Sequence, residues 1–230
     1  MLEQKVLDYI EEHAEEAREL LITLAQIPSP SNHEEKRAEF CKKWLEAQGA
    51  EGVFIDEALN VIYPIAVTKD NPVVVFMAHT DVVFPDMEAL PLTTENGRIY
   101  CPGVGDDTAN LVSLLMVAKY LAETGLAQKL KVAAATGDQP HGLVLVCNSG
   151  EEGLGNLKGS RKICQSYGSR IKEFYSFDGG LTSLSTHAVG SKRFKIKIHT
   201  IGGHSYSAFG NPNAIAQMAE LIHELYHVQV

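Results

Sequence analysis

The chain has 230 residues, 45% of them hydrophobic, and its 20 basic and 29 acidic side chains give a net charge of −9. This length allows one large domain or two ordinary ones with a buried core, and the composition excludes a disordered, collagenous or coiled-coil protein. The acidic balance argues against nucleic acid as a partner, because phosphate binding needs a basic face.

The sequence also argues against a membrane partner. No apolar stretch approaches the ~18 residues of a membrane span, and the acidic, amphipathic N-terminus does not resemble a signal peptide. The cysteines are scattered without CxxC spacing, which fits reduced thiols better than a disulfide framework. They are Cys41, Cys101, Cys147 and Cys164. We therefore expect a soluble cytoplasmic protein.

The first 48 residues predict two helices. Apolar side chains recur at helical spacing from Leu2 to Ile27, with acidic residues between them, which predicts a helix with one buried face. The prolines in residues 28–30 end this helix, since proline removes an amide donor. Ser31 or Asn32 is then expected to cap a second helix that ends at about Gln48.

Short apolar runs predict the strands of a sheet. They lie at residues 53–55, 61–67, 73–77, 143–147 and 171–177. The runs at 73–77 and 143–147 are continuous, as in strands that are buried on both faces. A loop rich in proline and glycine covers 84–107, and helices are predicted at 108–124 and 156–167. Helices that alternate with such strands indicate an α/β fold, with a mostly parallel sheet flanked by helices.

The pattern changes after about residue 187. Residues 192–200 alternate between polar and apolar side chains, which predicts a strand with one exposed face. A glycine turn follows at 202–203, and an amphipathic helix is predicted from Asn213 to about Tyr226. We interpret residues 1–187 as one domain. Residues 188–230 are interpreted as the beginning of a smaller α+β domain, because one strand and one helix do not make a stable unit alone.

Four groups of candidate functional residues follow the predicted strands or precede a predicted helix. They are His79-Thr80-Asp81, Gly105-Asp106-Asp107, Gly150-Glu151-Glu152-Gly153 and Asp178-Gly179. Residues two apart in an extended chain point the same way, so Asp81 can accept from one nitrogen of His79 while the other binds a metal. Taken alone, each group also fits a structural role, such as a turn or, for Asp107, a helix cap.

Together the four groups favour a metal site. Ligands bind at the carboxyl ends of strands in open α/β sheets, and several carboxylates gathered there need cations to pair with them. Two divalent cations balance Asp106, Glu152, Asp178 and one hydroxide, and zinc accepts this mixture of imidazole nitrogen and carboxylate oxygen. The GxxGxG spacing of residues 150–155 could also indicate a phosphate site. This alternative is weaker than a metal site, because the two carboxylates in the segment would repel phosphate.

These motifs resemble the co-catalytic zinc peptidase and deacylase family, which includes peptidase T, bacterial glutamate carboxypeptidase, aminoacylase and succinyl-diaminopimelate desuccinylase. The resemblance rests on residues 77–83, 105–107, 149–153 and 178–179, in this order, and on Ile27-Pro28-Ser29-Pro30-Ser31, which is similar to the family's N-terminal signature. It implies a zinc-exopeptidase-like catalytic domain over residues 1–187 and the start of a lid or dimerisation domain over 188–230.

The resemblance also implies roles for individual residues. His79 and Asp178 would bind one zinc, Glu152 would bind the other, and Asp106 would bridge both. Asp81 would orient His79.

The same resemblance implies a hydrolase of small peptides or N-acyl amino acids, with a slight preference for a peptidase T-like exopeptidase. Glu151 would be the general base that takes a proton from the metal-bridging water. His204, in Gly202-Gly203-His204-Ser205, would stabilise the oxyanion, usually across a homodimer interface, unless it is a plain turn histidine. Two Zn²⁺ ions are expected in the complete enzyme, with Co²⁺ or Mn²⁺ as substitutes.

The sequence departs from the family in two respects. Thr108-Ala109 stands where many members have Lys-Gly, at positions that are not ligands. Family members are also longer, and the histidine that completes their second zinc site lies in a segment without a counterpart here. We therefore expect an N-terminal portion of such an enzyme. The alternative is a non-catalytic fragment or binding protein that holds at most one metal.

Overall fold

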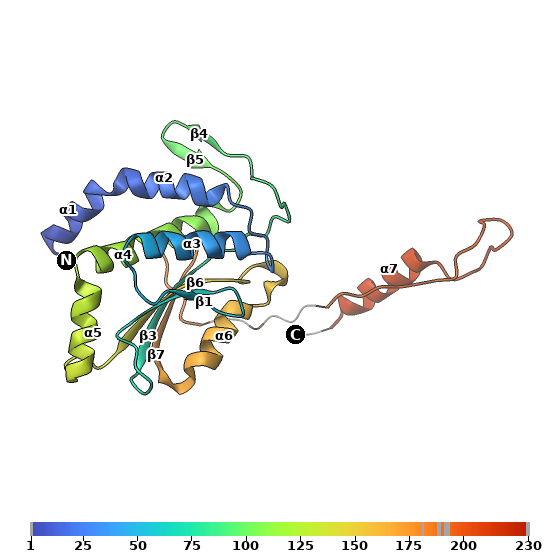
Figure 1. The fold of residues 1–230 in the computed structure, drawn as a ribbon. Coiled ribbons are helices and arrows are strands. Elements are labelled where there is room, and N and C mark those ends of the chain that lie inside the picture. The colour runs from blue at the N-terminus through green and yellow to red at the C-terminus, as the bar shows by residue number, and fades with distance from the viewer. Residues whose placement is uncertain (1, 181, 188–189, 191–193, 229–230) are drawn as a thin grey trace. The chain divides into compact units, whose positions relative to one another are not determined.

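The computed structural model describes residues 2–180, 182–187, 190 and 194–228. The chain divides into two compact units, Met1–Ser183 and Leu184–Val230. Among the described residues, the first unit contains both sheets and six α-helices, and the second contains one α-helix (Figure 1).

The first unit is built on a five-stranded sheet. Its strands are β1 (Phe54–Ile55), β2 (Val61–Ile65), β3 (Val73–His79), β6 (Gly142–Asn148) and β7 (Ile171–Phe177), in the spatial order β1-β2-β6-β3-β7. The neighbours β6, β3 and β7 are parallel, whereas β2 is antiparallel to both β1 and β6. Of these five strands only β2 therefore runs against the others, and the expectation of an α/β fold with a mostly parallel sheet is confirmed.

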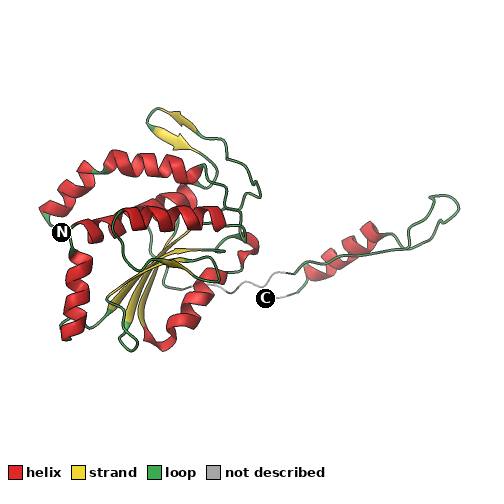
Figure 2. Cartoon of the chain, in the orientation of Figure 1, coloured by secondary structure: helices red, strands yellow, loops and turns green. Residues whose placement is uncertain are grey.

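Helices cover both faces of this sheet (Figure 2). They are α2 (Ala14–Ala25), α3 (Glu35–Ala47), α4 (Ala109–Glu123), α5 (Leu126–Thr136) and α6 (Lys158–Tyr167). The helix α1 (Gln4–Glu12) precedes them and contacts α4 through the rings of Tyr9 and Tyr120. The larger core joins α2–α5 to one face of the sheet through residues such as Leu24, Leu111 and Leu145. On the other face Ile163 of α6 packs among valines of β3 and β6. These two strands are therefore buried on both faces, which explains their continuous apolar runs.

Two predicted helices differ from those observed. The expected helix over residues 2–27 is interrupted at His13, where the backbone leaves helical geometry and both the amide and ring Nδ1 lie within hydrogen-bond distance of the Tyr9 carbonyl oxygen. The second helix begins at Glu35 rather than after Ser31, because Pro30 pairs with Val82 in a parallel bridge and keeps the chain extended. Asn32 then turns with a positive φ of 73°.

The loop over residues 84–107 contains a hairpin that the analysis of apolar runs missed. Strands β4 (Thr93–Glu95) and β5 (Arg98–Tyr100) pair around Asn96-Gly97, both with positive φ. Asn-Gly is typical of such tight hairpin turns. The irregular turn Val104–Thr108 then leads into α4.

In the second unit, the helix α7 (Ala214–Leu225) confirms the prediction for this segment. Asn213 caps it, because its side-chain oxygen accepts from the backbone N–H groups of Ile215 and Ala216. The predicted strand over residues 192–200 begins outside the described residues, and 194–200 form no strand, since no described strand of this unit pairs with them. None of the described helices is long and apolar enough to cross a membrane.

We predict that Leu111→Ala lowers the free energy of unfolding by about 2–5 kcal/mol, because it empties space in the larger core where the Leu111 side chain is fully buried. Urea denaturation followed by circular dichroism measures this loss. The same substitution at Leu154, which is 83% exposed, is the control and is expected to change stability by less than about 0.5 kcal/mol. Equal losses in both variants would contradict the assignment of the core.

Candidate metal centre

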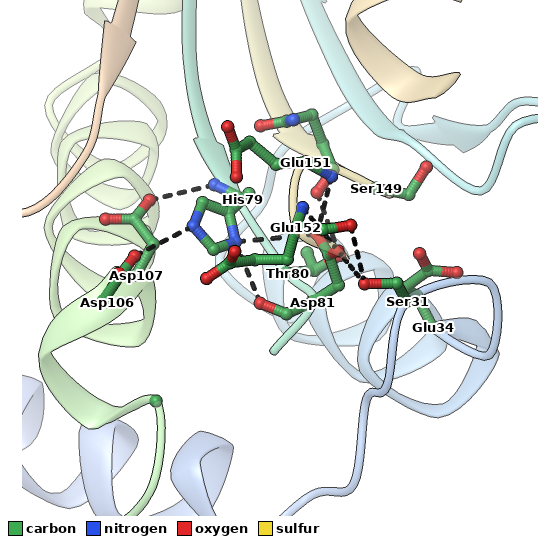
Figure 3. A network of polar contacts seen from close by, with 12 residues as sticks. Ser31, Glu34, His79, Thr80, Asp81, Asp106, Asp107, Ser149, Glu151 and Glu152 are labelled. Atoms are coloured by element: carbon green, nitrogen blue, oxygen red, sulfur yellow. Dashed lines mark hydrogen bonds and ion pairs between the residues drawn. The ribbon is translucent and has the colours of Figure 1, made fainter. Parts of the chain in front are cut away.

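His79 is the last residue of β3 and lies at the centre of the candidate site (Figure 3). Its side chain is 2% exposed, and its Nε2 atom lies 3.2 Å from Oδ1 of Asp106. The other ring nitrogen, Nδ1, lies 2.9 Å from the backbone carbonyl oxygen of Asp81 and 3.5 Å from its Oδ1 atom. One nitrogen is thus held by Asp81 while the other faces a carboxylate, although the nearer acceptor at Asp81 is the carbonyl rather than the side chain.

Asp81 is fully buried and accepts hydrogen bonds from the turn that follows β6. Its Oδ1 accepts the backbone N–H of Glu151, and its Oδ2 accepts that of Glu152, both at 3.0 Å. The hydroxyl of Ser31 donates to the same Oδ2 at 2.7 Å. Burial opposes ionisation, but these bonds and the neighbouring His79 outweigh it and hold the pKa of Asp81 below its ordinary value.

Asp106 and Asp107 precede α4, joined by a cis peptide bond, and have different surroundings. The side chain of Asp106 is 62% exposed and faces His79. Asp107 is buried, and its carboxylate accepts the backbone N–H of His79 at 3.0 Å and the side-chain amide of Asn110 at 2.6 Å. Burial is the main cause that raises the pKa of Asp107 to about 7. Asp107 therefore supports the end of β3 rather than capping the helix.

Two groups of potential ligand atoms meet at His79. One consists of His79, Asp106 and Asp178, and the other of His79, Glu151 and Glu152. Within each group these atoms lie within 4.8 Å of one another. The parallel pairing of β3 with β6 and β7 brings the groups together, because all three strands end at the same edge of the sheet.

The acidic residues of these groups disfavour one another's ionisation. Burial raises the pKa of Glu151 most, the charges of Asp178 and Glu152 add to this effect, and His79 opposes it. Burial also raises the pKa values of Glu152 and Asp178, with a further contribution from the charge of Asp106.

The site favours the charged form of the His79 imidazole, whereas it disfavours the charged forms of Glu151, Glu152 and Asp178. Burial disfavours its charge, but the hydrogen bond to Asp81 and the charges of Asp107 and other carboxylates outweigh burial and raise the pKa of His79 to about 10. A divalent cation can replace the proton that charges the His79 imidazole, and it can neutralise the carboxylates. Its binding would therefore release protons. The mixture of one imidazole with several carboxylates fits zinc, whereas carboxylates alone would favour Mg²⁺ or Mn²⁺.

The chain is similar to known proteins over most of its length. Residues 75–230 match the model of peptidase family M20/M25/M40. The chain belongs to this family. Its catalytic-domain fold is shared with aminopeptidase PepT from Bacillus cereus ATCC 10987, at 22% sequence identity and a TM-score of 0.53, over 72% of this chain and 43% of PepT.

Two further solved structures are similar to this chain in fold. The di-peptidase Dug1p from Saccharomyces cerevisiae is 18% identical, with a TM-score of 0.54, over 75% of this chain and 40% of Dug1p. Human carnosine dipeptidase 1 is 17% identical, with a TM-score of 0.53, over 76% of this chain and 41% of the dipeptidase. The chain thus spans about two fifths of the length of these structures.

His204, the remaining residue that the family resemblance singled out, belongs to the second unit. It is exposed, and its Nδ1 accepts the backbone N–H of Tyr206 at 3.2 Å. Its participation in the site stays a prediction.

The structure adds supporting residues that the sequence analysis missed. Buried Glu34 accepts the backbone N–H of Asn32 and the ammonium group of Lys158 at 2.7 Å. Buried Arg37 donates to the backbone carbonyl oxygens of Ile27 and Thr80. Both charged residues lie on the same face of the second predicted helix as Ala38, Cys41 and Leu45. Charge on an otherwise apolar face was the signal available in the sequence.

We predict that Asp81→Asn lowers the free energy of unfolding by about 1–3 kcal/mol, because an amide NH₂ in either orientation meets a backbone N–H donor and leaves it unpaired. Chemical denaturation at neutral pH measures the effect. Asp86→Asn makes the same change at an exposed position of the following loop and should alter stability by less than about 0.5 kcal/mol. Wild-type stability in the Asp81 variant would contradict the inference that its carboxylate stabilises the turn after β6.

Proposed function

We propose that the chain contains the metal-binding part of a two-zinc hydrolase that cleaves an amide bond in a small peptide or N-acyl amino acid. The observation that carries this proposal is the meeting of two His–carboxylate groups at His79, in a chain that belongs to a peptidase family. The donor types fit zinc, with Co²⁺ or Mn²⁺ as substitutes.

In this proposal His79 and Asp178 are ligands of one zinc, Glu152 is a ligand of the other, and Asp106 lies between the two. The grouping of Asp106 with His79 and Asp178 supports the first set. Asp106 is grouped with His79, which both sets share, and this supports the proposed place of Asp106 between them. When bound, such a pair of ions lowers the pKa of a shared water and polarises the scissile carbonyl group.

Glu151 is the proposed general base. Its raised pKa suits a group that takes a proton from the attacking water and passes it to the departing amine, since transfer is efficient when the pKa lies near the working pH. The backbone N–H of Glu151 is fixed by Asp81, which limits where the carboxylate can point.

Small peptides are the preferred substrates. PepT is named an aminopeptidase, and Dug1p and carnosine dipeptidase 1 are named dipeptidases, which favours a peptide over an N-acyl amino acid. The second unit would begin a lid through which the protein forms a homodimer, with His204 as an oxyanion donor. The four cysteines are free thiols, which supports a reducing compartment such as the cytoplasm.

We predict that Glu151→Gln lowers kcat for di- and tripeptide hydrolysis by about 100-fold or more while zinc stays bound, because the amide cannot accept the proton. Peptide turnover and zinc content are measured in this chain and in any longer protein that contains it. Exposed Glu88 provides the control, since Glu88→Gln should leave both unchanged. Full activity of Glu151→Gln would exclude the proposed base, and a folded wild type with at most one metal and no turnover would favour the non-catalytic alternative.

We further predict that zinc binding depends on His79. His79→Ala should weaken zinc affinity by at least about 10-fold in competition with a chromophoric chelator, because it removes the ligand common to both groups. His33→Ala, a change at an exposed histidine, should bind as the wild type does. Chelation by EDTA should abolish any peptidase activity, and zinc should restore it. Equal zinc affinity in both variants would place the metal elsewhere.

A further inference from the structure

Ser31 comes from the N-terminal loop and contacts both Asp81 and the turn that holds Glu151 and Glu152. Its hydroxyl oxygen lies 2.7 Å from Oδ2 of Asp81 and 3.0 Å from the backbone carbonyl oxygen of Glu152. Figure 3 shows it beside Asp81, on the side away from Asp106. We propose that Ser31 is a positioning residue, which locks Asp81 and thereby fixes the turn of the two glutamates relative to His79.

The hydrogen-bond inventory at Asp81 supports this role. The Ser31 hydroxyl has one proton and two acceptors within reach. The Asp81 carboxylate is the nearer and the stronger acceptor, so the proton is donated to it rather than to the Glu152 carbonyl oxygen. The same Oδ2 atom accepts the backbone N–H of Glu152, so Ser31 and Glu152 meet at one oxygen. Without the hydroxyl, Oδ2 would keep only the bond from Glu152, while Oδ1 would keep the bond from Glu151 and its contact with His79. The carboxylate would then be held less firmly at the oxygen that binds Glu152.

Ser31 can act as a fixed point because its own loop is held independently. Before it, the carbonyl oxygen of Ser29 accepts the backbone N–H of Val82, and Pro30 pairs with Val82. After it, Glu34 fixes the backbone of Asn32. The hydroxyl is therefore placed by contacts that do not involve the glutamate turn.

This inference rests on the proposed function only for what the turn does, and the position of the turn can be measured separately. Hydrogen exchange at the backbone amides of Glu151 and Glu152 reports their bonds to Asp81 whether or not the chain binds metal. Zinc affinity reports the consequence for the ligands, because loss of a residue that orients ligands typically weakens metal binding by about 10–100-fold.

The experiment compares four variants of the full 230-residue chain. Ser31→Ala removes the hydroxyl. Ser31→Thr and Ser31→Val form a matched pair of nearly equal shape, in which only threonine can donate to Asp81. Ser29→Ala is the control, because the buried Ser29 hydroxyl has no hydrogen-bond partner among the described residues. Thermal melts establish that each variant is folded.

We expect Ser31→Ala and Ser31→Val to exchange faster at Glu151 and Glu152 and to bind zinc at least about 10-fold more weakly. Ser31→Thr and Ser29→Ala should stay close to the wild type in both measurements. Unchanged exchange in Ser31→Ala, or equal losses in the threonine and valine variants, would overturn the positioning role. If the wild type binds no zinc, the proposed function fails, and the exchange data still decide whether Ser31 positions the turn.

Discussion

The buried carboxylate of Asp81 is the point at which three segments of the first unit meet. It accepts the hydroxyl of Ser31 from the N-terminal loop and two backbone N–H groups from the turn after β6, and its own residue holds His79. A buried carboxylate is costly unless its oxygens are paired, so the folded arrangement around it is strongly specified. The relative positions of His79, Glu151 and Glu152 therefore depend on Asp81, whose carbonyl oxygen contacts His79 and whose carboxylate binds the turn.

Acidic side chains outnumber basic ones around the candidate site. Carboxylates that follow β6 and β7 gather at this edge of the sheet. Burial is the main cause that raises their pKa values, and the charges of neighbouring carboxylates add to it. Behind them lies the buried guanidinium of Arg37, which donates to the carbonyl oxygen of Thr80 between His79 and Asp81. Burial lowers the pKa of Arg37 only to about 10, so it remains charged at neutral pH. Arg37 and the His79 proton balance only part of this negative charge, and a divalent cation that replaces the proton would balance more of it.

Much of the fold was predictable from the order of apolar runs. The strand over residues 171–177 and the helices near 108–124 and 156–167 are local patterns, and the structure contains each of them. At the start of the second helix, a distant partner overrides the local signal. Ser31 or Asn32 was expected to cap a helix, because serine and asparagine commonly do so. Ser31 instead donates to Asp81, fifty residues later in the chain.

By itself, the sequence determined the α/β class, the order of the acidic motifs and the residue types that suit zinc. Those properties follow from the periodicity of apolar residues, from the positions of motifs at strand ends and from side-chain chemistry. Each of these can be read from neighbouring residues in the sequence. Only the tertiary structure decided that Ser31, Glu34 and Arg37 support the site, because their partners are remote in sequence. It also decided the antiparallel direction of β2 and the grouping of ligand atoms at His79, since both depend on which strands pair and in which register.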